Sequence, residues 1–468
     1  MMSFANLGEN YYVAEWLIRL GALAVIPFRR SAAATRSWLL LIFFLPVPGL
    51  LLFLAIGSPR FPHWRAQRFA KLRPFFDGLA TRLREAGVAS ACGDGIATLA
   101  SRLGYLPATG SNGVEFLASY DEVLARLVAD IDAASRHVRI LAYIFADDEA
   151  GGAVIAALGR AVARGVPCHV LIDPVGSRAW RRGTVARLEA AGVAVRFTLP
   201  FRLLRGRTRR DMRNHRKLFL IDGAIGYAGS QNIVRKDFRP GVVNRELVLR
   251  VAGPVVAEMN AVFLADWYLE TEDLLEAEPH IPTSSGSAVV QTLPSGAEFP
   301  LEGFHTLLVW QINQATRRIV IATPYLVPDE ALLGALSTAA LRGVEIDLVV
   351  STVVDQRLVN LAQCSYYDEL LSSGVRIHRY RNFLLHAKNV CIDDRLAVVG
   401  SSNVDIRSFQ LNEEISLLLY DAQSIARLTA VQEGYMADGD RVILDEWRRR
   451  GRLRKLAENG ARLVGPLL

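Results

Sequence analysis

Helix-like and strand-like patterns alternate through the central part of the chain. Apolar residues recur at helical spacing in Ala125–Ser135 and again in Gly152–Arg164, which is followed by Gly165. Short continuous apolar runs at Val138–Ile144 and Pro167–Ile172 are typical of buried strands. This alternation predicts an α/β fold in which helices flank a mixed sheet.

The same order of elements returns in the C-terminal half. Helical patterns at Gly303–Ala315 and Ala331–Arg342 each precede a strand-like run, at Arg318–Ala322 and Glu345–Val350 respectively. A repeat of this length predicts two domains with one fold. We expect them to pack face to face about a pseudo-twofold axis, each contributing half of a shared site.

Composition indicates where the domains begin and end. The chain has 468 residues, enough for two or three domains. A Ser/Pro/Gly-rich stretch separates the repeats, and a short helix is expected near Phe75–Ala86 in the region before the first repeat. We expect an N-terminal membrane region at residues 1–70, a linker at 71–112 and a first domain at 113–278. A second linker at 279–296 then leads to a second domain at 297–468, which ends in a basic segment.

Two apolar segments lie near the N-terminus. The uncharged run 37–57 is as long as the roughly 20 residues that a spanning helix needs, and no signal-peptidase site follows it. The Pro46-Val47-Pro48-Gly49 cluster at its centre would break a straight helix, so a re-entrant hairpin or kinked helix competes with a span. The segment 11–28 carries two charges and fits an interfacial helix, or a weaker span paired with the first.

Overall composition agrees with a membrane-associated protein. Apolar residues make up 51% of the chain, which is high for a soluble enzyme. The formal net charge is +7, but arginines flank both apolar segments and give no orientation. The four cysteines are far apart without a C-x-x-C pair, so we expect neither a disulfide framework nor a zinc site, and a reducing compartment fits.

One polar pattern, H-x-K-x4-D-x6-G-S-x-N, occurs twice with identical spacing. One copy is weak evidence, whereas two copies at matching positions of a repeat indicate a shared function. The first copy contains His215, Lys217, Asp222, Ser230 and Asn232, and the second contains His386, Lys388, Asp393, Ser401 and Asn403.

Each copy is predicted to form a β-hairpin. An apolar run and then a turn follow each His-x-Lys, and Asp-Gly, found at Asp222-Gly223, is a strong turn signal. Because alternate residues of a strand point to one face, the histidine and lysine of each copy should point together. Arg216 and Ala387, which lie between them, should face away.

Two histidines and two lysines offered to one phosphate favour covalent phosphoryl transfer. A neutral imidazole can attack phosphorus, and a second, protonated imidazole can protonate the leaving alkoxide. The lysines with Asn232 and Asn403 can hold the phosphate oxygens. Glu246 and Glu414, at matching positions after the two motifs, are candidates to accept an imidazole N–H and orient the ring. We see no carboxylate cluster for a metal and expect no metal or other cofactor.

Several of these positions also have a structural interpretation. Asp222 and Asp393 occupy turn positions, so an orienting or structural role competes with chemistry. Ser230 and Ser401 either bind phosphate or satisfy the backbone at a strand end, and the two glutamates could form ordinary surface ion pairs. The remaining histidines have no repeated partner and are interpreted as structural: His63, His137, His169, His280, His305 and His378.

The doubled motif resembles that of the phospholipase D superfamily, and nearly the whole chain is similar to its bacterial cardiolipin synthases. The stretches that carry the similarity are Arg213–Lys217, Ile221–Gly223, Gly229–Ile233, Asp266-Trp267, Thr323–Tyr325, Leu385–Lys388, Asn403–Ser408 and the N-terminal apolar run. The resemblance implies two phospholipase D-like domains with a pseudo-twofold axis. It also implies transfer of a phosphatidyl group from one phosphatidylglycerol to another, giving cardiolipin and glycerol.

The resemblance also assigns roles to the histidines. His215 would be the nucleophile that forms a phosphatidyl-histidine intermediate, and His386 the acid and base. It places the protein in the bacterial inner (cell) membrane, where we expect the catalytic domains on the cytoplasmic side. Donor and acceptor preference, and whether the protein forms an oligomer, stay open.

Two basic clusters accompany these features. One runs from Arg202 to Lys217, and the other from Arg448 to Arg462, interleaved with Trp447 and leucines. A solvated face is one interpretation. Adhesion to anionic lipid is the other, since each basic residue near such a surface contributes about 1 kcal/mol and interleaved apolar residues suit an interfacial helix.

Other functions are compatible with part of the pattern. A phospholipase D-type hydrolase would use the same residues with water as the acceptor. A nuclease would use the same chemistry to cleave the phosphodiesters of a nucleic acid, to which a basic protein can bind. The membrane segment and the lack of an aromatic stacking series argue against a nucleic-acid partner, and two complete motifs argue against a purely structural scaffold.

Overall fold

The computed structural model describes residues 4–29, 32–57, 62–90, 95–200 and 212–464. The basic cluster that starts at Arg202 therefore lies outside the described residues up to position 211. Of the four cysteines, the three in the described ranges, Cys168, Cys364 and Cys391, are buried and free.

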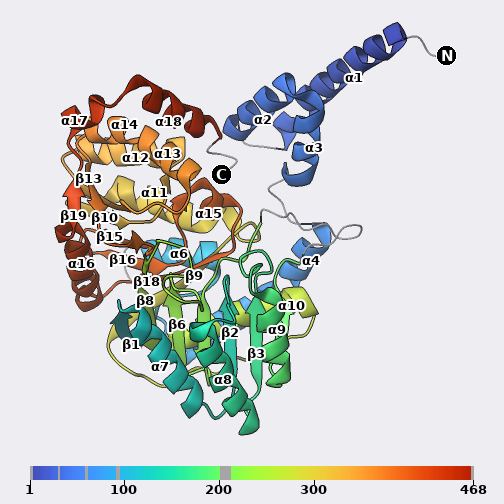
Figure 1. The fold of residues 1–468 in the computed structure, drawn as a ribbon. Helices are drawn as coiled ribbons and strands as arrows, with labels where there is room; N and C mark the ends of the chain where they lie inside the picture. Colours follow the sequence, from blue (N-terminus) through green and yellow to red (C-terminus); the bar gives the residue numbers. More distant parts are fainter. Residues whose placement is uncertain (1–3, 30–31, 58–61, 91–94, 201–211, 465–468) are drawn as a thin grey trace.

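One continuous sheet of 15 strands runs through both halves of the molecule (Figure 1). In the first half the strands lie in the order β1 (Thr109–Leu117), β8 (Val248–Ala252), β6 (Ile225–Gly229), β5 (Leu218–Ile221), β2 (Val138–Ala142), β3 (Cys168–Ile172) and β4 (Ala194–Phe197). The second half has β9 (Ala288–Ser295), β18 (Glu414–Leu419), β16 (Leu396–Gly400), β15 (Asn389–Ile392), β10 (Arg318–Ala322), β12 (Glu345–Ser351), β13 (Arg376–Tyr380) and β19 (Gly439–Arg441). The first seven strands of each half match in order, and the predicted mixed α/β fold with pseudo-twofold symmetry is confirmed.

The two half-sheets join edge to edge and not face to face. β1 pairs antiparallel with β9, in the register Thr109↔Val290 and Asn112↔Ala288. Both strands reach into the C-terminal ends of the stretches expected to be linkers, 71–112 and 279–296. The glycines and small polar residues of β1 hide its strand character, because a central strand is specified by its neighbours more than by local propensity.

Helices cover both faces of the sheet. α10 (Val255–Thr271) and α16 (Ala422–Ala437) share one face and contact strands of both halves. The other face carries α7 (Tyr120–Ala133) and α8 (Glu149–Ala163) in the first half, and α11 (Gly303–Gln314) and α12 (Glu330–Leu341) in the second. The predicted helices are confirmed to within a few residues. Asp148 and Asp329 cap α8 and α12 by accepting a hydrogen bond from the first-turn amides of Gly151 and Leu332.

Shorter elements complete the chain. The helices are α4 (His63–Lys71), α5 (Arg73–Glu85), α6 (Ile96–Gly104), α9 (Arg181–Ala190), α13 (Arg357–Ser365), α14 (Tyr367–Ser372), α15 (Ile406–Gln410), α17 (Leu444–Arg448) and α18 (Arg452–Val464), with 3₁₀ turns at Ile26–Phe28 and Pro300–Glu302. Two small parallel sheets, β7 (Asn244–Arg245) with β14 (Leu384–Leu385) and β11 (Leu326–Val327) with β17 (Val404–Asp405), lie outside the main sheet.

The apolar run 37–57 does not form one straight helix. It divides into α2 (Ala32–Phe44) and α3 (Pro46–Ile56), because Leu45 leaves the helical region at φ −132° and ψ 75° before Pro46. At 1.5 Å per residue these helices measure about 20 and about 16 Å, short of the roughly 30 Å of a bilayer core. The two pack closely where Gly49 faces Ile42. The broken-helix alternative is therefore confirmed and the single straight span is wrong.

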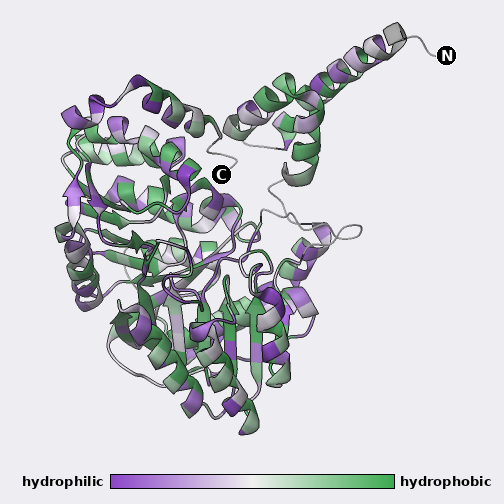
Figure 2. Cartoon of the chain, in the orientation of Figure 1, coloured by the Kyte–Doolittle hydropathy of each residue, from purple (hydrophilic) through white to green (hydrophobic). Residues whose placement is uncertain are grey.

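The longer apolar helix lies upstream. α1 (Phe4–Val25) projects from the body, and α2 and α3 beside it are largely apolar (Figures 1 and 2). The segment Gly8–Phe28 has a mean hydropathy of 1.3 and, among the described residues, is the one helix long and apolar enough to cross a membrane. Two of its charged residues pair with each other, since Arg19 lies 3.2 Å from Glu15, and Arg19 also donates to the carbonyl of Phe43 at the end of α2.

The basic C-terminal cluster forms α17 and α18. Trp447 is buried against Tyr367, with ring centroids 4.9 Å apart, so its expected role at a lipid surface is wrong. Three leucines of α18 are instead exposed: Leu453, Leu456 and Leu463.

Candidate active site

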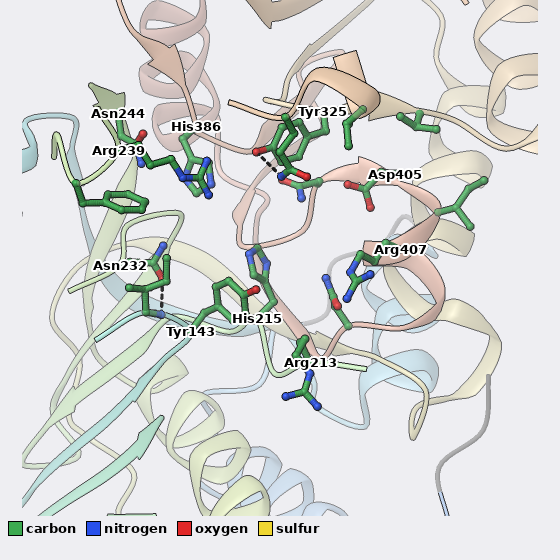
Figure 3. Close-up of a pocket in the computed structure, with 18 residues that line it drawn as sticks. Tyr143, Arg213, His215, Asn232, Arg239, Asn244, Tyr325, His386, Asp405 and Arg407 are labelled. Carbon is green, nitrogen blue, oxygen red and sulfur yellow. Dashed lines mark hydrogen bonds between the residues drawn. The ribbon is translucent and has the colours of Figure 1, made fainter. Parts of the chain in front are cut away.

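The two motif histidines meet at one cavity between the halves of the molecule (Figure 3). The cavity encloses about 250 Å³, and His215, His386, Asn232 and Asn403 all line it. His215 lies just before β5 and His386 just after β14, so both are on extended backbone flanking strands and not within the hairpin strands. The hairpins themselves, β5–β6 and β15–β16, form as predicted.

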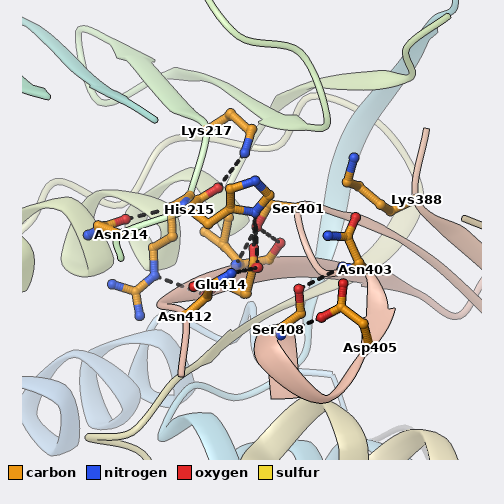
Figure 4. A network of polar contacts seen from close by, with 12 residues as sticks. Asn214, His215, Lys217, Lys388, Ser401, Asn403, Asp405, Ser408, Asn412 and Glu414 are labelled. Carbon is orange, nitrogen blue, oxygen red and sulfur yellow. Dashed lines mark hydrogen bonds and ion pairs between the residues drawn. The ribbon is translucent and has the colours of Figure 1, made fainter. Parts of the chain in front are cut away.

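Each histidine is bound by a glutamate from the opposite half. The Nδ1 atom of His215 lies 3.0 Å from both carboxylate oxygens of Glu414. Figure 4 shows these two side chains in contact. The Nδ1 atom of His386 lies 2.8 and 2.9 Å from those of Glu246. The structure thus brings all four predicted residues together in two crossed pairs.

Backbone hydrogen bonds between the halves hold these pairs in register. The amide of His215 donates to the carbonyl of Glu413 at 2.8 Å. In the mirrored arrangement, the amide of His386 donates to the carbonyl of Arg245 at 2.8 Å. Each histidine is therefore positioned by the residue that directly precedes its glutamate in the opposite half.

The glutamates select the reactive nitrogen. A carboxylate accepts the Nδ1–H of a neutral imidazole, which leaves the Nε2 lone pair for the cavity. This is how a carboxylate orients a catalytic histidine in hydrolytic triads. Burial opposes the charge of Glu414 and Glu246, but the neighbouring histidines and lysines hold their pKa below its usual value, so both remain carboxylates.

Burial governs the protonation of the histidines. It lowers the pKa of His215 to about 4, although Glu414 acts in the opposite direction, and it lowers the pKa of His386 to about 4 in the same way. Both rings are neutral at neutral pH, which suits a nucleophile. A proton on the second ring requires additional negative charge nearby, and a bound phosphate supplies it.

The motif lysines lie behind the histidines. Lys217 is buried and its Nζ donates to the carbonyl of His215 at 2.6 Å, and Lys388 donates to the carbonyl of His386 in the same manner. Burial lowers the pKa of Lys217 to about 7 and that of Lys388 to about 8. These ammonium groups add positive charge beside the cavity and also fix the backbone that carries each imidazole.

The motif serines do not line the cavity. The hydroxyl of Ser401 donates to Glu414 at 2.5 Å, and that of Ser230 donates to the carbonyl of Leu247 at 3.2 Å. Each hydroxyl also accepts a backbone N–H of the facing strand, from Leu247 or Ile415. The structure therefore favours the structural role that the sequence left open.

The two motif aspartates do not line the cavity, so the structure favours an orienting or structural role over the chemical role that the sequence also allowed. Asp222 is seven residues beyond His215, on the order of 20 Å along an extended chain. Its carboxylate accepts hydrogen bonds from the amides of Ser135, Arg136 and His137. Asp393 accepts the equivalent three amides of the loop before β10. Both carboxylates hold a helix-to-strand loop on the turn of the hairpin.

The asparagines divide into two groups. Asn232 accepts the amide of Ile144 through Oδ1 at 3.1 Å, so its Nδ2 is left to donate into the cavity. Asn244 and Asn412, which sequence reasoning missed as site residues, donate to Glu246 and Glu414 at 3.2 and 3.4 Å. Their signal was present, because each precedes its glutamate by two residues and so shares its face on extended backbone.

Arg216 links the two halves behind the site. It faces away from the cavity as predicted, yet it is buried and lies 2.5 Å from Asp266 of α10 and 2.8 Å from Glu413. Its Nε also donates to the carbonyl of Glu414 at 2.9 Å. A buried guanidinium with several acceptors holds the backbone on which the histidine partner lies.

Comparison with known proteins decides the family. Residues 127–267 and 308–434 match the family described as cardiolipin synthase, PLD-like domain. The chain belongs to this family. The two matched segments correspond to the two halves of the fold, each with one histidine motif.

This member of the family is similar to curated relatives over nearly its full length. Cardiolipin synthase A of Erwinia tasmaniensis is 33% identical over 482 residues, covering 98% of this chain and 99% of the relative. Cardiolipin synthase A of Serratia proteamaculans is 32% identical with the same coverage. Among solved structures, the phosphatidylserine synthase of Haemophilus influenzae superposes with a TM-score of 0.61 at 16% identity, over 79% of this chain and 99% of that one, and supports the fold.

Proposed function

We propose that this protein is a cardiolipin synthase that moves a phosphatidyl group from one phosphatidylglycerol to the hydroxyl of another and releases glycerol. The observation that carries the proposal is the pair of imidazoles facing one cavity, each oriented by a glutamate of the opposite half. The curated relatives, which are named cardiolipin synthase A, support the same activity.

The first half-reaction forms a phosphatidyl-histidine. The Nε2 lone pair of His215 attacks phosphorus, and the bond from phosphorus to the glycerol oxygen breaks. His386, protonated once the phosphate anion is bound, gives its proton to the departing glycerol alkoxide. The imidazolium character that develops on His215 is stabilised by Glu414.

The second half-reaction regenerates the enzyme. Neutral His386 accepts the proton of a hydroxyl on the second phosphatidylglycerol, whose oxygen attacks phosphorus. The nitrogen–phosphorus bond then breaks and His215 returns to its neutral form. Lys217 and Lys388 add positive charge near the phosphate oxygens throughout, and the Nδ2 of Asn232 donates to one of them.

Membrane location follows from the substrate and the N-terminal helices. We place α1, α2 and α3 in the bacterial inner membrane, with the catalytic halves on its cytoplasmic side. Phosphatidylglycerol is anionic, so a membrane surface that contains it would attract the basic C-terminal helix α18 and would bury its exposed leucines.

Product analysis tests the proposal. The purified protein is incubated with phosphatidylglycerol labelled in its phosphatidyl group, in detergent, and the lipids and free glycerol are resolved. Cardiolipin with an equal amount of glycerol is expected. Phosphatidic acid without cardiolipin would instead identify a phospholipase D-type hydrolase, in which water replaces the second lipid. The His215→Ala and His386→Ala double variant is the blank.

A further inference from the structure

A large apolar groove lies next to the catalytic cavity, between three helices that are distant in sequence. It encloses about 790 Å³ and is formed by α2, α12 and α18. Leu40 and Phe44 of α2 face Leu333 of α12 and Leu463 of α18, and Gly460 completes the α18 side. The polar residues Arg36, Glu330 and Arg462 also line it.

The groove and the catalytic cavity share a wall. Ile406, at the start of α15, lines both of them. Its neighbours Asp405 and Arg407 line the catalytic cavity as well. The two spaces are therefore neighbours that meet at Ile406.

The sizes of the two spaces suit different parts of a phospholipid. About 250 Å³ in the catalytic cavity is below the ~300–1,000 Å³ of pockets that enclose a drug-sized ligand. It suits a glycerol phosphate and not two long acyl chains. The groove is about three times larger and its helical walls are apolar, as the chains require.

The position of the groove also favours a lipid over other occupants. One wall is α2, which belongs to the apolar N-terminal region, and Leu40 and Phe44 are 53% and 77% exposed. Arg36 lies 3.2 Å from Glu330, and this exposed pair connects α2 to the catalytic body. The groove thus adjoins the catalytic cavity at Ile406 and is walled on another side by α2, one of the helices proposed to lie in the membrane.

We infer that the acyl chains of the phosphatidyl group transferred by His215 lie in the groove between α2, α12 and α18 while its phosphate occupies the catalytic cavity. The inference rests on the proposed function and adds how the lipid is held. Chain binding in this groove would keep the acyl chains in an apolar environment while the phosphate lies in the polar cavity at His215.

A glycine in the groove wall offers a clean test. A Cβ added at Gly460 meets no atom within 4 Å, so the side chain of Gly460→Trp starts in open space at the groove wall. Gly334 on α12 is equally open but does not line the groove, which makes Gly334→Trp the matched control. Leu40→Trp, at an exposed groove position, is a second filling variant.

The readout is the ratio of kcat/KM for long-chain to short-chain phosphatidylglycerol, measured as dioleoyl and dihexanoyl lipid in the same detergent. Gly460→Trp and Leu40→Trp should lower this ratio roughly tenfold, because several methylene groups lose their apolar contacts. Gly334→Trp should keep the wild-type ratio. An unchanged ratio in both filling variants overturns the inference.

Two further outcomes keep the inference separate from the proposed function. If the groove is an interface between two copies of the chain, Gly460→Trp will change the mass measured by light scattering and reduce both rates equally, which also overturns it. Wild-type protein that makes no cardiolipin from either lipid would refute the proposed function instead.

Discussion

His215 and Glu414 belong to different halves of the molecule, yet the Nδ1 atom of His215 lies 3.0 Å from both carboxylate oxygens of Glu414. His386 and Glu246 form the reciprocal pair. Neither half therefore contains a complete histidine–carboxylate unit. Joining the half-sheets through β1 and β9 is what orients both imidazoles.

The crossed pairing assigns a separate step to each glutamate. Glu414→Gln should slow the attack of His215, and Glu246→Gln should slow proton transfer by His386, each by roughly 10²–10⁴-fold as for other oriented catalytic histidines. Quenched-flow trapping of labelled lipid on the protein separates them. Adduct should form slowly in Glu414→Gln, whereas identical adduct kinetics in both variants would contradict distinct roles.

The nucleophile assignment makes a qualitative prediction about the trapped adduct. His215→Ala should give no lipid–protein adduct, because among the described residues the only other imidazole that lines the cavity is His386, the proposed acid and base. His386→Ala should form adduct slowly and then retain it, since the base that activates the second lipid is missing. Mass spectrometry of the acid-quenched protein checks both, and adduct in His215→Ala would reverse the assignment.

The lowered pKa values of the two motif lysines predict that activity falls at alkaline pH. Burial lowers the pKa of Lys217 to about 7 and that of Lys388 to about 8, so both are charged below these values and lose charge as the pH rises through them. kcat/KM for anionic lipid should therefore fall above about pH 7–8. The limit for kcat should lie higher, since the bound phosphate favours the charged lysines. Profiles that stay flat through this range would exclude such a contribution.

Asp222 should prove to be a residue of stability and not of catalysis. Asp222→Ala removes the acceptor of three loop amides and should lower the free energy of unfolding by about 2–3 kcal/mol, while kcat of the folded protein stays near wild type. Although burial opposes its charge, those amides lower the pKa of Asp222, so its contribution is complete above the ordinary carboxyl range and is lost as the pH falls through the lowered pKa. Asp222→Asn, which tolerates the φ of 57°, is the milder control.

Arg216 should be more important for folding than its position beside the motif histidine suggests. Arg216→Met leaves Asp266 and Glu413 buried without their cation and should cost about 3–5 kcal/mol of stability. Arg216→Lys keeps one charge and should lose less. Denaturant unfolding followed by circular dichroism measures the difference, and equal stabilities for the two variants would argue against a charge effect.

Local signals account for the features that the sequence predicted well. The hairpins that follow His215 and His386 each combine an apolar run with a turn, and both are decided within a dozen residues. The helices α8 and α12 have their own caps and apolar faces. The break at Leu45 also has a local cause in Pro46, which is why the sequence already held the broken helix as an alternative.

Other features depend on contacts that no local pattern encodes. Trp447 is a tryptophan beside basic residues and leucines, which is typical of a lipid-facing position, but Tyr367 and Arg450 cover its ring. β9 lies in a stretch rich in serine, proline and glycine, and it becomes a strand because β1 and β18 flank it on either side. Burial by distant segments overrides local propensity in both cases.

The sequence by itself determined the repeat, the two His-x-Lys motifs, their hairpins and the group of polar residues from which the site is made. Only the tertiary structure decided the pairing, namely that Glu414 serves His215 and Glu246 serves His386, that the serines and aspartates support the backbone, and that a groove beside α2 adjoins the cavity. The physical reason is the distance along the chain over which each kind of interaction acts. Strand alternation and turn chemistry act between neighbours in the chain, whereas a hydrogen bond between residues of opposite halves exists only after the two half-sheets have joined.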